Sequence, residues 1–195
     1  MNLRTYHHGD LRRALLDAAV RHIATDGVDA LSLRALARDV GVTHAAPYRH
    51  FESKGHLLAA IAEEGFQILN TMVGPIFGGG GDLRQAFRES GAIYVRFAVE
   101  HPGYFKVMYG PTRLTAGYAE GLDSAGPQEL AKYEMLVAPL CTDGRSPRGV
   151  ALASWAMVHG IAMLLVDGRL RPDLFGLADD DYTGLVKVIT DSYLP

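Results

Sequence analysis

The single cysteine and the histidines are the side chains that could carry catalysis or hold a metal ion. Cys141 is the only cysteine of the chain, and the loop TDGRSP that follows it places no general base beside it in the sequence. A cysteine nucleophile needs such a base within hydrogen-bond reach, so no catalytic constellation forms around Cys141 or around His159, the other candidate. His7 and His8 have no further ligands at zinc spacing nearby, which favours packing or solvation over a metal site. We therefore expect no catalytic residue, no metal and no cofactor. An enzyme or a small-molecule carrier is the less favoured hypothesis.

A run of glycines could instead cradle a phosphate group. Residues 73–81 read VGPIFGGGG, with Pro75 followed by four successive glycines. The lysine and the hydroxyl residue of a phosphate-binding loop are missing. Because proline and consecutive glycines disfavour a helix, the segment predicts a flexible loop.

A third group of side chains suits hydrogen bonding to DNA. Residues 32–51 read SLRALARDVGVTHAAPYRHF, which fits two short helices joined by a tight turn at Gly41. Ala37 lies four residues before that glycine, and a small residue there lets two helices cross closely. The second helix is expected to begin at Thr43 and run to about His50, with short side chains that let its backbone enter the major groove. On pattern alone, an ordinary helical hairpin is an equal alternative.

A wider stretch carries a specific resemblance. The segments YHHGDLRRALLDAA and DALSLRALARDVGVTHAAPYRHFESKGHLLAAI closely resemble the N-terminal domain of the tetracycline-repressor (TetR) family, over roughly residues 6–70. Order, spacing and the closing YRHF-x-S-K all match. The resemblance implies a DNA-binding transcriptional regulator, and in particular a ligand-responsive repressor that binds a palindromic operator as a homodimer. A protein-interaction module that uses the same two helices is the remaining alternative, and it predicts binding that is insensitive to salt.

The resemblance also implies roles for individual residues. The DNA-binding residues would be Ser32, Thr43, His44, Ala45, Ala46, Tyr48, Arg49, His50 and Lys54, with Tyr48, His50 and Lys54 on phosphates. The helix-turn-helix core would be Leu36, Ala37, Gly41, Val42 and Phe51. Pro47 departs from the pattern, because many relatives place leucine or another good helix former there. Proline removes one backbone hydrogen bond, so we expect it to shift the start of the recognition helix rather than abolish DNA binding.

Composition agrees with a regulator and excludes a globally basic nucleic-acid binder. The chain has 195 residues, is 48% hydrophobic and carries a formal net charge of −3. Residues 1–60 have a net charge of +2, whereas residues 61–195 have a net charge of −5. A mildly basic head on an acidic body suits a DNA-reading end joined to a part that avoids DNA. One cysteine and a polar N-terminus without an apolar signal core favour the reducing cytoplasm.

The elements that must position these residues are all predicted to be helices. The 3.6-residue spacing and the breakers predict helices over residues 10–25, 32–41, 54–72, 82–100, 104–109, 127–141, 148–167 and 179–193. The expected class is all-α, with a three-helix helix-turn-helix DNA-binding domain over residues 1–53 (family-type domain about 10–70). Residues 54–195 would form a larger helical ligand-binding and dimerisation domain.

The expected body has the composition of a small-molecule pocket. Its candidate pocket residues are Tyr94, Phe97, Tyr104, Phe105, Met108, Trp155, His159 and Met163. Pockets are mostly apolar with a few polar groups, so an effector of unknown identity is compatible with this set, while core packing is the alternative for each residue. The strings SWAMVHG and HPGYFKVMYGP resemble a C-terminal subclass of the same family marked by Trp-His-Gly, here Trp155, His159 and Gly160.

Two helices of the body are expected to form the dimer. Residues 149–166 have no formal charge, and the helix over residues 148–167 is apolar nearly all round. A surface helix of a monomer should have a polar face, and a membrane span needs about 20 dominantly apolar residues. Because Ser154, His159 and Gly160 interrupt this segment, a subunit interface shared with residues 179–193 is favoured over a membrane span.

Overall fold

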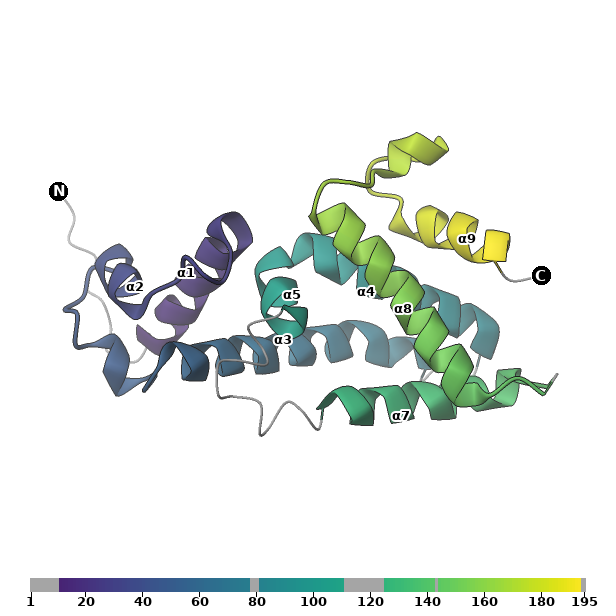
Figure 1. Ribbon diagram of the computed structural model, residues 1–195, viewed down its shortest axis with the longest axis horizontal. Helices are drawn as coiled ribbons and strands as arrows, with labels where there is room; N and C mark the ends of the chain where they lie inside the picture. The colour runs from purple at the N-terminus through teal and green to yellow at the C-terminus, as the bar shows by residue number, and fades with distance from the viewer. Residues whose placement is uncertain (1–10, 78–80, 111–124, 143, 194–195) are drawn as a thin grey trace. The chain divides into compact units, whose positions relative to one another are not determined.

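The computed structural model describes residues 11–77, 81–110, 125–142 and 144–193. Every regular element in these ranges is a helix, so the all-α prediction is confirmed for them (Figure 1). The described helices group into two compact units. The first contains the described residues up to Phe66 and again from His101 to Gly110, and the second contains those from Gln67 to Glu100 and from Ala125 onward.

The first unit begins with three helical segments around a small core. They are α1 (Leu11–Asp26), α2 (Leu33–Asp39) and the first half of α3 (Lys54–Phe77), with the short 3₁₀ helix η1 (Pro47–Arg49) between α2 and α3. The side chains that build the core are at most 6% exposed; they are Leu15, Leu16, Ala19, Ile23, Leu33, Leu36, Phe51, Leu57, Leu58 and Ile61. Their spacing of three and four residues turns one face of each helix inward.

The prediction of a loop over residues 73–81 is wrong for residues 73–77. The helix α3 continues through Pro75 and ends at Phe77, and residues 78–80 lie outside the described ranges. Proline has a fixed φ that suits a helix, but it lacks the N–H that would bond to the carbonyl oxygen of Thr71, and its ring crowds that carbonyl. The helix nevertheless includes Pro75 and ends two residues after it.

A later helix completes the first unit, although its sequence lies within the expected body of residues 54–195. This helix, α5 (Pro102–Tyr109), packs against α1. Gly103 allows the close approach, because a Cβ atom there would lie 2.3 Å from the carbonyl oxygen of Val20. Lys106 donates from Nζ to the carbonyl oxygen of Ala24 at 2.8 Å. This contact gives α1 a partner that local sequence patterns could not reveal.

A polar network also joins the helices of the first unit. Arg13 on α1 donates from Nε to Asp17 at 2.8 Å and pairs with Glu64 on α3. It also lies 3.3 Å from the hydroxyl of Tyr104 on α5. The hydrogen bond to Asp17 raises the pKa of Arg13 above its usual value. The guanidinium therefore stays charged and links α1, α3 and α5.

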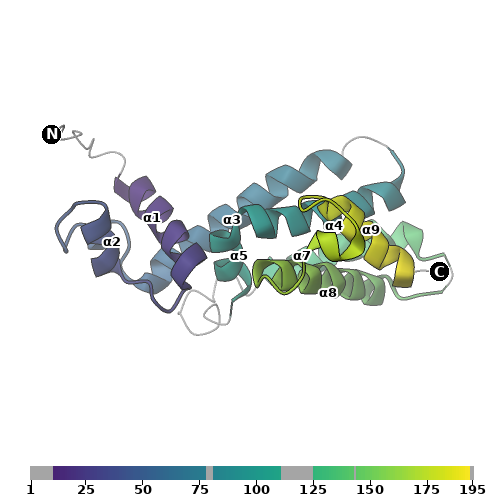
Figure 2. The same ribbon diagram turned by 90° about the horizontal axis from the view of Figure 1, so that it is seen from above.

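The second unit is a bundle built on α4 (Leu83–Glu100). The helix α8 (Pro147–Val166) packs on both α4 and α7 (Ala125–Val137). The helix α9 (Tyr182–Tyr193) lies against α4 (Figures 1 and 2). Two short 3₁₀ helices, η3 (Ala138–Leu140) and η4 (Pro172–Phe175), follow α7 and α8. The predicted helix over residues 127–141 is therefore an α-helix that tightens to 3₁₀ before Cys141.

We predict that Gly103→Ala destabilises the protein by about 1–3 kcal/mol, because the added methyl group overpacks the contact between α5 and α1. The urea midpoint, followed by circular dichroism, should fall. Gly74→Ala on α3 is the control, since nothing lies within 4 Å of a Cβ atom there. It should be neutral or stabilising by up to about 1 kcal/mol. Equal midpoints for Gly103→Ala and the unmodified protein would contradict the close approach.

Candidate nucleic-acid interface and apolar cavity

The turn after α2 is built by residues that the sequence singled out. Ser32 caps α2, and its Oγ accepts from the backbone N–H of Ala35 at 3.2 Å. Gly41 has a φ of +75°, the left-handed conformation that glycine adopts at little cost. The N–H of Gly41 donates to Arg38 at 3.2 Å, and that of Val42 donates to Ala37 at 2.9 Å. These two bonds form a Schellman motif, which ends α2 and redirects the chain.

Three of the five predicted helix-turn-helix core residues are buried around that turn. Leu36, Ala37 and Phe51 are each 0% exposed, Val42 is half-buried, and Gly41 is exposed at the turn itself. The absence of a large side chain at Ala37 allows close packing beneath the turn. The residues that follow are therefore attached to a rigid base.

The predicted α-helix from Thr43 to His50 is wrong. The residues after the turn form a second turn, in which the N–H of Ala46 donates to Thr43 at 3.0 Å. The 3₁₀ helix η1 follows, with Pro47 as its first residue. Proline has no N–H to continue a helix that began at Thr43, but it suits the first position of a new one. The helix therefore starts at Pro47 instead of Thr43, a shift of more than one turn of α-helix. We call residues 43–50 the recognition segment.

Most of the predicted DNA-contacting side chains reach solvent. Those of Ser32, Thr43, His44, Ala45, Tyr48 and Arg49 are exposed, and those of Ala46, His50 and Lys54 are half-buried. The Ser32 hydroxyl serves as the α2 cap, so its first role is structural. Lys54 donates from Nζ to the carbonyl oxygen of Asp29 at 3.3 Å, which holds its ammonium group near the start of α2.

One cation beside the recognition segment escaped the sequence reasoning. The guanidinium carbon of Arg12, on α1, lies 5.3 Å from the centre of the Phe51 ring. This is a cation–π distance, and Arg12 itself is exposed. Among the described residues no acidic side chain forms an ion pair with it. No local signal predicts this contact, because the two residues are far apart in the sequence.

A hydrogen bond links α1 to α2 behind the turn. His22 bonds through Nε2 to the carboxylate of Asp39, and its Nδ1 lies 3.6 Å from Asp26. The hydrogen bond from His22 lowers the pKa of Asp39 below its usual value. An acidic group close to the recognition segment is thereby engaged within the protein.

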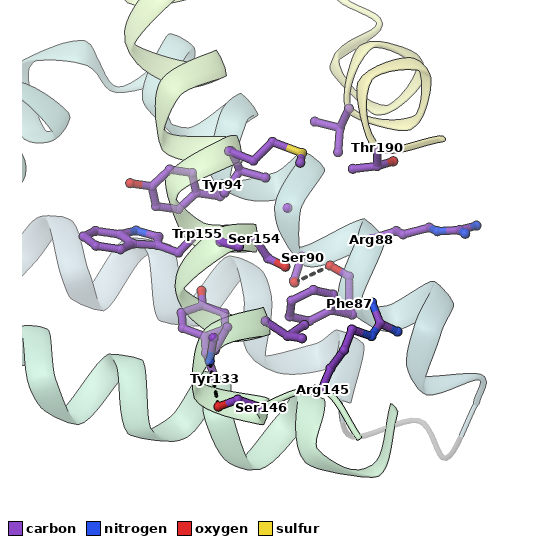
Figure 3. A pocket seen from close by; sticks show the side chains of 18 residues that line it. Phe87, Arg88, Ser90, Tyr94, Tyr133, Arg145, Ser146, Ser154, Trp155 and Thr190 are labelled. Atoms are coloured by element: carbon purple, nitrogen blue, oxygen red, sulfur yellow. Dashed lines mark hydrogen bonds between the residues drawn. The ribbon is translucent and has the colours of Figure 1, made fainter. Parts of the chain in front are cut away.

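The second unit contains an apolar cavity of about 420 Å³. Its walls come from α4, α7, the start and middle of α8, and α9, and Phe87, Tyr133 and Trp155 are among the aromatic side chains that line it (Figure 3). Pockets of about 300–1,000 Å³ with mostly apolar walls hold small organic molecules. We call this space the α8 cavity.

Two of the predicted pocket residues line the α8 cavity, and a third, His159, contacts both of them. Tyr94 and Trp155 line it, and the Tyr94 hydroxyl lies 2.8 Å from Nδ1 of His159. The indole of Trp155 lies beside the His159 ring, with 5.6 Å between ring centres and 37° between the ring planes. Burial lowers the pKa of His159, so the imidazole is neutral at pH 7, and with its proton on Nε2 it accepts the hydrogen bond from Tyr94.

The other predicted pocket residues do not line the α8 cavity. Phe97 is completely buried, while Met163 is 40% exposed on α8. Tyr104, Phe105 and Met108 are buried in the first unit. They share aromatic or methionine chemistry with the cavity residues but belong to a different core. Conversely, the sequence reasoning missed Phe87, Tyr133 and Arg145, which only the packing of α4, α7 and α8 brings together.

Cys141, the candidate nucleophile, and His7 and His8, the candidate metal ligands, differ in what the structure describes of them. The thiol of Cys141 donates to the carbonyl oxygen of Val137 at 3.3 Å. Within the described ranges no group of three or more His, Cys, Asp or Glu is placed to hold a metal ion. His7 and His8 lie outside those ranges.

Both the N-terminal and the C-terminal part of the chain match known protein families. Residues 15–61 match the bacterial regulatory proteins of the tetR family, and residues 87–187 match the tetracyclin repressor-like C-terminal domain. That second description names no Trp-His-Gly subclass, so the subclass stays a prediction. The chain is 26% identical over 161 residues to the nucleoid occlusion factor SlmA of Marinobacter nauticus, covering 82% of each protein.

Solved structures share the fold along nearly the whole chain. A protein of unknown function from Rhodococcus sp. RHA1 is 34% identical, with a TM-score of 0.75 over 97% of this chain and 96% of that one. AibR, solved with isovaleryl coenzyme A and operator DNA, is 20% identical, with a TM-score of 0.73 over 91% of this chain and 97% of that one. At that identity the likeness to AibR establishes the fold alone.

We predict that His159 makes the protein less stable in mild acid. Because burial places the folded-state pKa of His159 below its ordinary value of 6.5, the unfolded chain binds the proton more readily. Stability should therefore fall as the pH drops below 6.5, and His159→Gln should flatten that part of a plot of melting temperature against pH. A slope that is identical in His159→Gln and the unmodified protein would refute the assignment.

Proposed function

The chain belongs to the TetR family of bacterial regulatory proteins, and we propose that it is a ligand-responsive repressor that binds a palindromic operator as a dimer. Members of this family are DNA-binding transcriptional regulators, and that function is the premise here. The observation that carries the proposal is the recognition segment, an exposed stretch that follows the left-handed turn at Gly41 above the buried side chains of Ala37 and Phe51. A rigid base with an exposed polar edge is what base reading requires.

The proposed contacts divide into two kinds. Thr43, His44, Ala45 and Ala46 are short or polar and would face the base edges, where small side chains let the backbone come close. Arg49 is exposed and would add charge to either kind of contact.

Phosphate contacts would come from the residues on either side. Tyr48, His50 and Lys54 follow the turn in the sequence, and Arg12 lies beside Phe51. Such contacts fix the register of a protein on DNA without reading the sequence. They also make binding weaken as salt rises, which separates operator binding from a protein-interaction role.

Dimerisation is proposed through α8 and α9. Exposed apolar side chains lie along them, namely Leu152, Trp155, Met163 and Leu164 on α8 and Val188 on α9. By length and composition alone, Pro147–Val166 could also cross a membrane, and only 17% of its most apolar window is buried. We favour a second copy of the chain as the cover, because a DNA-binding regulator works in the cytoplasm and two copies match a palindromic site.

The α8 cavity is the proposed effector site. Its walls are four separate segments of the second unit, so a ligand there would favour one packing of those helices over another. A ligand shifts a conformational equilibrium only by its difference in affinity for the two states. AibR, with its acyl coenzyme A ligand and operator DNA, is a precedent for this fold.

We predict that Arg49→Ala and Tyr48→Ala each weaken operator binding by about tenfold or more, because each removes a DNA contact. Electrophoretic mobility shift with the DNA upstream of the protein's own gene measures this at low salt. Arg169→Ala, at an exposed position after α8, removes the same charge and should bind as the unmodified protein does. No shift at low salt, or shifts that neither variant changes, would count against the proposal.

We also predict that Leu164→Glu converts the dimer to a monomer, because it places a carboxylate on the exposed apolar face of α8. Light scattering after size-exclusion chromatography measures the mass. Leu174→Glu is the matched control, since Leu174 is even more exposed, at 67%, but lies on η4. If Leu164→Glu remains dimeric, or the unmodified protein is a monomer at concentrations that bind DNA, the proposed interface is wrong.

A further inference from the structure

We infer that the α8 cavity takes an organic acid, with an apolar body and one carboxylate that lies toward Arg145. This inference rests on the cavity being the effector site proposed above, and it specifies the chemical class of that effector. The family assignment leaves this class open.

The first observation is the charge of the lining. Among the described residues that line the cavity, Arg88 and Arg145 are cationic and none is Asp or Glu. The surrounding body is acidic, since residues 61–195 carry a net charge of −5. The composition of the acidic body does not explain a positively charged lining. The positive charge lowers the energy of an anion within the cavity.

The second observation is where the two cations point. In Figure 3 the side chain of Arg145 rises toward Phe87, while Arg88 extends away from the cavity. Arg88 lies 4.0 Å from Asp191, which Lys187 also approaches to 3.3 Å. Arg145 is therefore the nearer partner for a ligand, and Arg88 adds charge at the rim.

Arg145 has contacts within the protein as well. A guanidinium carries five N–H donors in a planar fork, so it can keep such contacts and still donate to a carboxylate. The first turn of α8, from Pro147, lies at the same end of the cavity and contributes partial positive charge. Together these groups define an anionic end.

The remaining walls set the other half of the ligand. Phe87, Tyr94, Tyr133, Trp155 and Met157 supply aromatic and apolar surface. Ser90 is 4% exposed and already donates to the carbonyl oxygen of Phe87 at 2.7 Å, so it adds little polarity. A hydrocarbon or aromatic body fits such walls.

Other charges fit the cavity less well. A cationic ligand would lie beside two exposed arginines with no carboxylate among the described lining residues, so like charges would repel it. A phosphate monoester carries a charge of about −1.5 to −2, which is more than the single guanidinium of Arg145 neutralises. A single carboxylate matches Arg145 in both charge and bidentate geometry.

Trp155 provides a direct test, because it is the only tryptophan of the chain and it lines the cavity. The full-length protein, without DNA, is titrated with 4-phenylbutyrate, 4-phenylbutanamide and 4-phenylbutylamine while tryptophan emission is recorded. These probes share one apolar body and differ in charge. We expect the acid to change the emission at the lowest concentration, the amide at a higher one and the amine at the highest.

Substitution of the arginine then locates the anionic end. Arg145→Gln should weaken binding of the acid by about 10- to 100-fold, as for loss of a charge-assisted hydrogen bond, and should change binding of the amide little. Arg84→Gln, an exposed arginine on α4 outside the lining, is the matched control and should change neither. Circular dichroism checks that both variants are folded, and the probe series on the unmodified protein does not depend on them.

The inference is overturned if the three probes bind equally well, if the amide or amine binds more tightly than the acid, or if none changes the emission up to its solubility limit. Because the titration contains no DNA, these outcomes are separate from operator binding. A protein that prefers the acid but never shifts DNA would refute the repressor proposal and leave the ligand class standing.

Discussion

The left-handed turn at Gly41 is the constraint on which the DNA-reading surface depends. It ends α2 through two backbone bonds, to Arg38 and Ala37, and sends the chain outward as the recognition segment. Leu36, Ala37 and Phe51 are completely buried beneath it, and this packing holds the exposed residues that follow in a fixed position. Pro47 then determines the form of that segment, since it allows a short 3₁₀ helix where a longer α-helix would otherwise run.

The first unit is completed by contacts that span long distances in the chain. Arg13 links Glu64 and Tyr104, while Gly103 lets α5 approach α1 closely. The aromatic and methionine side chains of α5 thereby enter the core of the DNA-reading unit. Tyr104, Phe105 and Met108, which were predicted to line a pocket, therefore pack in this core instead.

The helix α8 has two different uses. Part of α8 meets α4 and α7 and lines the cavity, where Trp155 lies beside His159 and His159 bonds to Tyr94. The exposed apolar side chains of α8 include Leu152 and Leu164, and Trp155 belongs to both sets. A helix that is apolar nearly all round satisfies both requirements, which accounts for a composition that also resembles a membrane span.

Local patterns in the sequence determined the class of the fold, most helix positions and the key turn. Ser32, Gly41 and the buried stripe of α2 are read correctly because caps, left-handed glycines and 3.6-residue spacing act within a few residues. The predictions for the recognition segment and for the end of α3 were wrong around Pro47 and Pro75, because one proline begins a short 3₁₀ helix and the other lies within the last turn of a long α-helix. Only the tertiary structure decided that Arg12 lies over Phe51, that α5 joins the first unit, and that Arg145 shares a cavity with Tyr94. Each of these brings together residues that are distant in the chain, and no periodicity or spacing encodes which distant faces will pack.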